Sequence, residues 1–99
     1  MDKTLYSAER QILLSLLRDA RAAAGISQTE LASALDWTQG MVSKAEKGDR
    51  TLDAVELREW LRNLGQDLPA FTELWEQRIA AHEASAQARP IKRAAGKAR

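Results

Sequence analysis

The sequence contains no cysteine and a single histidine, His82, among its 99 residues. Without cysteine there is no disulfide framework, and a lone histidine without ligand companions offers no metal site. No apolar run approaches the roughly 20 residues that a membrane-spanning helix needs. The N-terminal residues, MDKTLYSAER, lack the hydrophobic segment of a secretion signal. We therefore expect a cytoplasmic protein without a metal ion and without membrane association.

The sequence also lacks the residue sets from which catalytic sites are built. It has no glycine-rich phosphate loop, and its carboxylates are scattered over solvated helix faces or stand at predicted helix starts. No nucleophile, base and orienting group can be brought together from the remaining residues. We therefore expect no enzymatic activity and no cofactor.

Charge is unevenly distributed along the chain, although the net charge is only +1. Residues 1–84 carry ten Lys and Arg against fourteen Asp and Glu, whereas residues 85–99 carry five basic residues and no acid. An acidic body with a basic arm suggests contact with a polyanion through the arm. The tail has too few apolar residues to order itself. We therefore divide the chain into a folded domain, 1–84, and a flexible basic tail, 85–99. The tail is either a solvated extension or an arm lying on phosphate or in a minor groove; a helical extension is a further alternative, because alanine and arginine are good helix formers.

Capping residues and apolar periodicity predict five helices. The expected helices span residues 8–24, 28–35, 39–47, 54–64 and 70–84. The N-cap candidates, whose side chains can accept a hydrogen bond from a free backbone N–H, are Ser7, Ser27, Thr38 and Asp53. Apolar residues at helical spacing predict an inward face formed by Leu13, Leu14, Leu17, Ala20, Ala24, Val42, Ala45, Leu57, Trp60, Leu61 and Leu64. Ile12 and Leu16 widen this face and belong either to the core or to a dimer surface.

Residues 27–48, SQTELASALDWTQGMVSKAEKG, are predicted to form two short helices joined by a tight turn. The outward side of the second helix mixes amide, hydroxyl, cationic and small groups; its members are Gln39, Gly40, Met41, Ser43 and Lys44. Such a face suits the DNA major groove, where Gln can bind adenine, Lys can donate to guanine and Met can contact a thymine methyl. Spacing alone leaves a purely structural helical hairpin as an equal alternative.

The motifs G-I-S-Q-x-E-L-A at residues 25–32 and V-S-K-x-E-x-G at residues 42–48 resemble the phage repressor and Cro (XRE-like) helix-turn-helix family. With Arg21 and Leu35, the resemblance covers about residues 14–68. It implies an all-α, compact five-helix domain of the lambda-repressor type, with the third helix in the major groove. It also implies an ion pair between Arg21 and Glu46, which would turn this acid inward.

Residues beside the reading helix are candidates for holding the DNA backbone. They are Ser27, Gln28, Thr38, Lys47 and Arg50. Gln28 stands at a helix start, where free N–H groups favour an anion, and the resemblance implies that it binds a phosphate. An ordinary exposed polar residue is the alternative for Gln28.

The chain departs from the family pattern at three positions. Asp36 stands where the family usually has the turn glycine, and Trp37 replaces a small aliphatic residue. Because aspartate tolerates the left-handed conformation better than most residues, we expect the turn to survive. Gly40 stands where the family often has a long polar side chain, so it either lets the backbone approach DNA closely or removes one base contact.

Four apolar residues share roughly one face of the last predicted helix: Phe71, Leu74, Trp75 and Ile79. Such a stripe usually belongs to the core. In related small repressors, however, the last helices make the two-fold contact, so the resemblance implies a homodimer through these residues. We therefore predict a homodimeric transcriptional repressor that binds an inverted repeat in double-stranded DNA. The alternative is an antitoxin-type interaction module that binds a toxin or other partner protein and represses its own operon.

Overall fold

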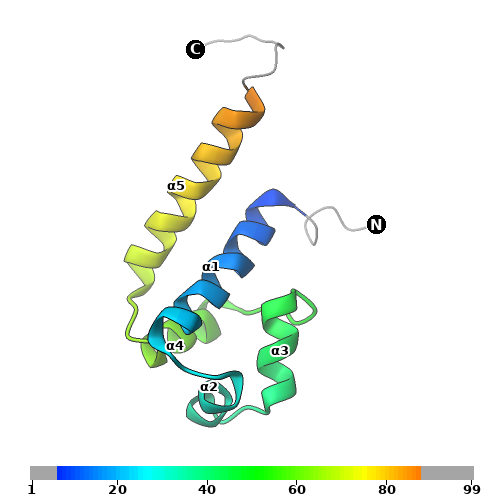
Figure 1. Cartoon of the computed structure of the whole chain (residues 1–99), viewed down its shortest axis with the longest axis vertical. Coiled ribbons are helices and arrows are strands. Elements are labelled where there is room, and N and C mark those ends of the chain that lie inside the picture. Colours follow the sequence, from blue (N-terminus) through cyan, green and yellow to red (C-terminus); the bar gives the residue numbers. More distant parts are fainter. Residues whose placement is uncertain (1–6, 88–99) are drawn as a thin grey trace.

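The computed structural model describes residues 7–87, and over this range the chain forms five helices and no strand (Figure 1). The helices are α1 (Ala8–Ala24), α2 (Gln28–Leu35), α3 (Gln39–Lys47), α4 (Ala54–Asn63) and α5 (Leu68–Gln87). The prediction of an all-α, five-helix fold is confirmed. The fifth helix is longer than predicted at both ends, so the segment assigned to the tail begins inside α5. The rest of that tail, residues 88–99, lies outside the described residues.

The first four helices begin at the predicted capping residues. Those side chains, each accepting a backbone N–H from three residues further on, are Ser7, Ser27, Thr38 and Asp53. Glu30 and Glu56 complete capping boxes at α2 and α4 by accepting the N–H of the capping residue. Asp36 ends α2 with φ of 61°, in the left-handed conformation. The turn between α2 and α3 therefore forms without the usual glycine.

The core is assembled from all five helices around Trp60, which is fully buried. Its buried members are Leu14, Leu16, Leu17, Ala20, Leu31, Ala32, Val42, Ala45, Trp60, Leu61, Leu64 and Phe71. Leu16, which the sequence left open, belongs to the core. The expectation for Ala24 was wrong, because this residue is exposed in the last turn of α1, directly before the chain turns at Gly25. No helix in the described range is long and apolar enough to cross a lipid bilayer.

The three tryptophans take different places in one core: Trp60 is buried in it, and Trp37 and Trp75 pack against it from the outside. Trp37 lies half-buried and meets Trp60 edge to face, with ring centroids 6.0 Å apart and an interplanar angle of 71°. Trp75 is also half-buried, and its indole Nε1 donates to the carbonyl oxygen of Glu9 at 2.8 Å. This hydrogen bond ties α5 to the first turn of α1.

The helices are arranged so that α1 lies between α3 and α5 (Figure 1). In this view α3 stands on the right of α1 and α5 on its left, while α2 and α4 lie below. Helix α3 packs against α1 and α2, and α4 packs against α2 and α5. As a result, the outer side of α3 is left uncovered by any other described helix.

Candidate nucleic-acid interface

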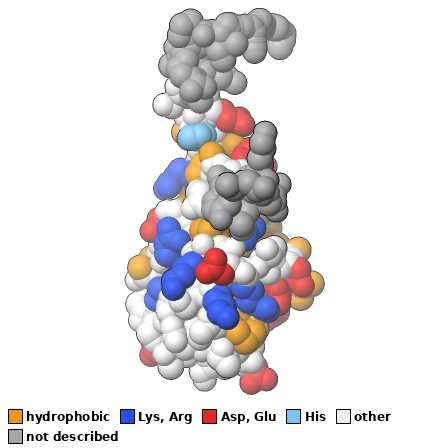
Figure 2. All heavy atoms as spheres, turned by 90° about the vertical axis from the view of Figure 1, so that its right-hand side faces the viewer, with side chains coloured by type: hydrophobic (Ala, Val, Ile, Leu, Met, Phe, Trp, Pro, Cys, Tyr) orange, Lys and Arg blue, Asp and Glu red, His pale blue; other side chains and the backbone are white. Residues whose placement is uncertain are grey.

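Helix α3 turns its apolar side to the core and its polar side to solvent. Val42 and Ala45 are 0% and 1% exposed. The five predicted base-reading residues occupy the other side; Gln39, Gly40 and Lys44 are exposed, and Met41 and Ser43 are half-buried. Figure 2 shows the side of the molecule on which α3 lies, with several Lys and Arg side chains across the middle of this face and acidic side chains among them. The structure therefore brings these five residues together on the side that carries these basic groups.

Glu46 is the acid that holds α3 against α1. Arg21 donates to both of its carboxylate oxygens, from Nε to Oε2 at 2.6 Å and from Nη2 to Oε1 at 3.1 Å. Glu46 is only 2% exposed. Hydrogen bonding to Glu46 raises the pKa of the Arg21 guanidinium above its ordinary value, whereas burial acts to lower it. A bidentate Arg–carboxylate pair fixes orientation as well as distance, so it fixes how α3 sits on the domain.

A chain of two glutamines extends this contact towards the reading surface. Gln28 Nε2 donates to Glu46 Oε1 at 2.8 Å, and Gln39 Nε2 donates to Gln28 Oε1 at 2.7 Å. Gln39 keeps one amide N–H and its carbonyl oxygen, the two groups that a bidentate contact with adenine requires. Gln28, predicted to bind a phosphate, thus also positions Gln39. The backbone N–H of Gln28, in the first turn of α2, has no partner within the helix.

Two arginines of α1 that the sequence analysis did not select meet the C-terminal end of α3. Arg18 Nη1 donates to the carbonyl oxygen of Glu46 at 2.8 Å, and Arg10 Nη2 donates to that of Gly48 at 3.0 Å. Cations are favoured at a helix C-terminus, where carbonyl groups lack partners within the helix. The spacing of Arg10, Arg18 and Arg21 places them on roughly one side of α1, and this was the signal available in the sequence. They add positive charge beside Lys47.

The residues predicted to hold the DNA backbone differ in how free they are to do so. Ser27 and Thr38 are exposed at the starts of α2 and α3, and Lys47 is exposed at the end of α3. Arg50, by contrast, is held within the domain: its guanidinium carbon lies 4.5 Å from the ring centroid of Trp37. It also donates to Glu56 Oε2 at 2.8 Å. Arg50 therefore offers less uncompensated charge to a phosphate than Lys47 does.

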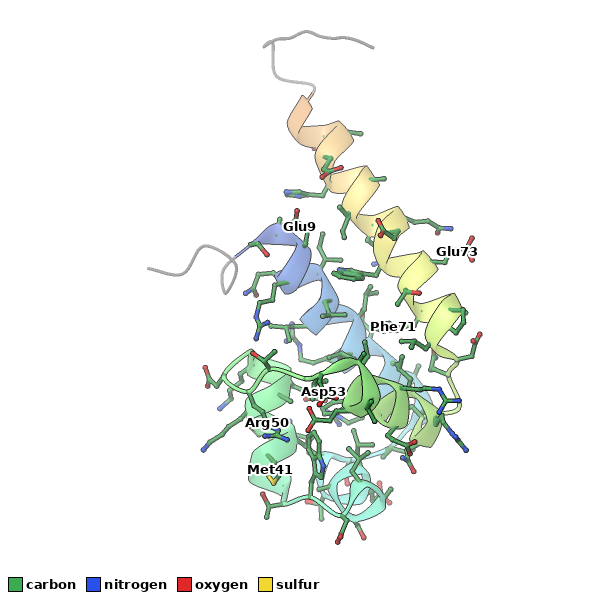
Figure 3. All side chains as sticks on the ribbon, turned by 180° about the vertical axis from the view of Figure 1, so that it is seen from behind. Glu9, Met41, Arg50, Asp53, Phe71 and Glu73 are labelled. Carbon is green, nitrogen blue, oxygen red and sulfur yellow. The ribbon has the colours of Figure 1, made fainter. Side chains whose placement is uncertain are left out.

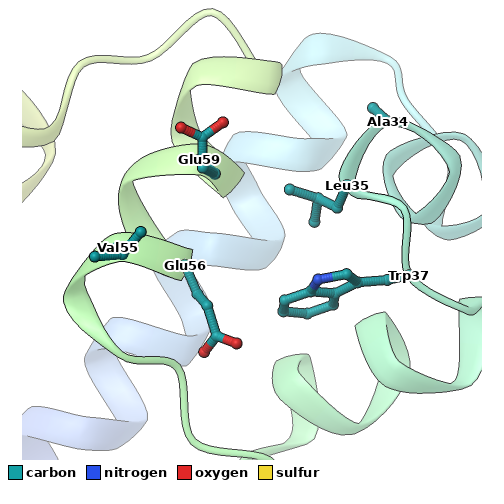
Figure 4. A pocket seen from close by; sticks show the side chains of 6 residues that line it. All are labelled: Ala34, Leu35, Trp37, Val55, Glu56 and Glu59. Carbon is teal, nitrogen blue, oxygen red and sulfur yellow. The ribbon is translucent and has the colours of Figure 1, made fainter.

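Trp37 fits in place of a small residue because the adjoining surface is open. A hollow of about 170 Å³ lies beside its ring, between α4 and the end of α2 (Figure 4). Leu35 and Val55 line the hollow with Trp37, and Val55 is 72% exposed. The larger side chain thus extends the core outwards instead of displacing Trp60.

The four residues predicted to form the dimer contact do not share one environment. Phe71, marked near the start of α5 in Figure 3, is 3% exposed and lies in the core of its own chain. Trp75 and Ile79 are half-buried. Leu74 is 36% exposed. Phe71 therefore cannot contact a partner without leaving the core, because α5 turns this side chain inwards. Leu74 is the member most accessible to a second chain.

Replacing Gly40 with alanine is expected to raise the free energy of unfolding by about 1 kcal/mol, because glycine inside a helix is less favourable than alanine. An added Cβ would meet only Thr38 Oγ1, at 3.8 Å. The same substitution at Gly48 is the contrast, since its φ is +91° and a Cβ there would lie 2.9 Å from Leu14 Cδ1. Urea unfolding midpoints should move in opposite directions for the two variants. A lower midpoint for Gly40→Ala would contradict the expectation.

Comparison with known proteins places this geometry among regulators. The helix-turn-helix family HTH_3 matches residues 17–71. The chain is similar to the solved structure of an XRE-family like protein from Pseudomonas syringae pv. tomato, with 43% identity and a TM-score of 0.71; the match covers 77% of this chain and 93% of that one.

Two further solved structures are similar. The clp gene regulator ClgR from Corynebacterium glutamicum is 25% identical, with a TM-score of 0.69, over 81% of this chain and 85% of that one. A variant of the Restriction-Modification Controller Protein C.Esp1396I is 21% identical, with a TM-score of 0.68, over 77% of this chain and 96% of that one. The last likeness concerns the fold alone. No curated protein sequence matches the chain.

Proposed function

The chain belongs to the XRE-type helix-turn-helix family, and we propose that it is a homodimeric transcriptional repressor that binds an inverted-repeat operator. At the coarser level it is a DNA-binding transcriptional regulator, as its family and its similarity to the regulator ClgR indicate. The observations that support the finer proposal are the exposure of α3 and its fixed position on the domain. Its polar side is uncovered, while Arg21 and the two glutamines fix its position on the domain.

Base recognition is assigned to the exposed side of α3. Gln39 is held by Gln28 with one amide N–H and its carbonyl oxygen remaining for the edge of an adenine. Lys44 is exposed five residues further along, about 1.4 helical turns, and can donate to guanine. Met41 and the bare backbone of Gly40 suit contact with a thymine methyl. Because Gln39 is positioned before DNA arrives, less side-chain entropy is lost on binding.

Contacts with phosphate are assigned to both ends of the reading helix. At one end, the first backbone N–H groups of α2 and α3 lie beside Ser27, Gln28 and Thr38, and such groups favour anions. At the other end, Lys47 lies near the arginines of α1 that hold the C-terminus of α3. These contacts would set the register of the protein on the duplex without specifying sequence.

A two-fold dimer would present two copies of α3 to the same side of the duplex. Their centres should then be about one DNA turn apart, roughly 34 Å, and the operator should be an inverted repeat with matching spacing. No ligand-binding domain accompanies the helix-turn-helix within residues 7–87.

Fluorescence anisotropy tests the proposal with DNA taken from immediately upstream of the gene for this chain. A scrambled duplex of equal length, at the same near-physiological salt concentration, is the control. Specific regulators bind their sites about a thousandfold or more tightly than other DNA, and we expect a difference of that size. Equal and weak binding to both duplexes would contradict the proposal and would point to a hairpin used for protein contact.

A further inference from the structure

The hollow beside Trp37 is an apolar surface that DNA recognition leaves unused. Its volume is about 170 Å³, and Leu35, Trp37 and Val55 form its apolar lining (Figure 4). Val55 is 72% exposed, twice as much as Leu74, the other exposed large hydrophobic residue of the described range. None of the residues that line the hollow is assigned above to a base or a phosphate. An apolar side chain bound there would remove apolar surface of both partners from water.

The charged residues that line this hollow are both acids, Glu56 and Glu59. Glu56 is already engaged, because its carboxylate accepts hydrogen bonds from Arg50 Nη2 and from the backbone N–H of Asp53. Glu59 is exposed and belongs to neither of the ion pairs found among residues 7–87. The hollow therefore suits a segment that carries an apolar side chain next to positive charge.

The chain itself contains such a segment outside the described residues. Residues 88–99, ARPIKRAAGKAR, carry five Lys and Arg and no acid. Ile91 is the one large aliphatic residue among them, and Arg89, Lys92 and Arg93 stand on either side of it. Its composition thus complements the hollow in both respects, with one apolar side chain for the apolar lining and bases for Glu59.

We propose that the hollow binds residues 89–93 of a second copy of the chain. Ile91 enters between Trp37 and Val55, and the neighbouring bases lie beside Glu59. A polyanion would use the charges of this segment without Ile91, whereas the hollow uses both. Contact with DNA phosphate is therefore the alternative that an experiment on Ile91 distinguishes from this one.

The contact joins two molecules, because the segment does not reach the hollow of its own chain. From Leu68 to Gln87, α5 carries the chain over about 29 Å. Its end lies away from α2 and α4, at the other end of the fold (Figure 1). Ile91 follows Gln87 by four residues, which span at most about 14 Å.

A contact between a tail and a hollow joins unlike surfaces, so it can continue from one molecule to the next. It leaves the exposed side of α3 uncovered, and it therefore links molecules that occupy neighbouring positions on DNA. It requires neither the two-fold dimer nor operator binding, so its failure would leave the proposed function untouched.

Nuclear magnetic resonance of the full chain tests the contact with a synthetic peptide of residues 88–99. The labelled chain carries Ile91→Ser, so that its own tail competes less for the hollow. The peptide should shift the indole N–H signal of Trp37 and the amide signals of Val55 and Glu59. The same peptide with Ile91→Ser keeps every charge, but it should bind at least about tenfold more weakly, since burial of two methylene-sized groups contributes about that factor. Equal shifts from both peptides, or no shift at the hollow, would overturn the proposal in favour of contact through charge alone.

Charge reversal in the labelled chain gives a second criterion. Glu59→Arg should weaken peptide binding on the order of tenfold, because an attractive contact at the surface becomes a repulsive one. Glu73→Arg is the matched control, since Glu73 is exposed on α5 and does not line the hollow. It should change the affinity by less than about twofold, because distant exposed charges are screened by salt. Equal losses for the two variants would show that the peptide responds only to net charge.

Dilution of the wild-type chain decides between contact within and between molecules. With contact between molecules, the Trp37 signal should move on dilution towards its position in the Ile91→Ser chain. A difference between the two chains that does not depend on concentration would place the tail on its own molecule and would overturn the link.

Discussion

Glu46→Gln is expected to lower the free energy of unfolding by about 3 kcal/mol, near the lower limit for breaking a buried ion pair by removing one partner. The carboxylate accepts two hydrogen bonds from Arg21 and one from Gln28 and is almost fully buried. The amide would leave Arg21 without a counter-charge and would turn an N–H group towards another donor. Since small domains are stable by about 5–15 kcal/mol, urea unfolding should show a large shift in midpoint.

Glu73→Gln is the matched control, because Glu73 is exposed on α5 and the chemical change is identical. It should change the free energy of unfolding by less than about 0.5 kcal/mol, as surface substitutions usually do. A double-mutant cycle with Arg21→Ala and Glu46→Ala adds a second criterion. The free energy of unfolding of the double variant should fall by clearly less than the sum of the two single decreases, because the second deletion removes a charge that the first had already left unpaired. Strict additivity would mean that the two side chains act independently.

Much of the fold follows from signals that are local in the sequence. Ser27 with Glu30 and Asp53 with Glu56 form their capping boxes as predicted, because every partner lies within one helical turn. Asp36 adopts the left-handed turn as expected from its short polar side chain. The core was also largely predictable, since leucines at helical spacing must face a common interior. Ala24 was misplaced because periodicity does not say where the neighbouring helices end.

The parts that could not be predicted depend on contacts between distant segments. Periodicity groups Phe71 with Leu74 on one face of α5, but only the packing of α5 on α1 shows that one is buried and the other exposed. Helix spacing likewise gives no distance between Gln28 and Gln39, whose contact depends on the angle between α2 and α3. Arg18 and Arg10 were missed for the same reason, because their acceptors at the end of α3 are far away in the sequence.

The largest effect on DNA recognition is expected for Gln39→Ala. If Gln39 binds adenine through its remaining N–H and carbonyl groups, the variant should lose about 1–3 kcal/mol of discrimination at one base pair of each half-site. Competition anisotropy with operators substituted singly at every position would locate that base pair. Affinity for the other substituted operators should fall by a common factor. A loss shared equally by all operators would contradict a base-reading role for Gln39.

Lys47→Ala is the control that distinguishes a phosphate contact from a contact that reads a base. Lys47 is exposed at the end of α3 and is assigned to phosphate, so its removal should weaken binding evenly over all operators. The slope of log affinity against log salt should also become shallower by about 0.9 for each phosphate that the variant no longer neutralises.

Gln28→Ala should behave unlike Gln39→Ala and Lys47→Ala, because the Gln28 side chain contacts both Glu46 and Gln39. Its removal leaves Gln39 without the contact to Oε1 that positions it, and it deletes a hydrogen bond to Glu46. We therefore expect an even loss of affinity together with partial relaxation at the base pair that Gln39→Ala identifies. The combined variant Gln28→Ala with Gln39→Ala should be no less selective at that base pair than Gln39→Ala alone. An additional loss of selectivity there would show that Gln28 acts on the base independently of Gln39.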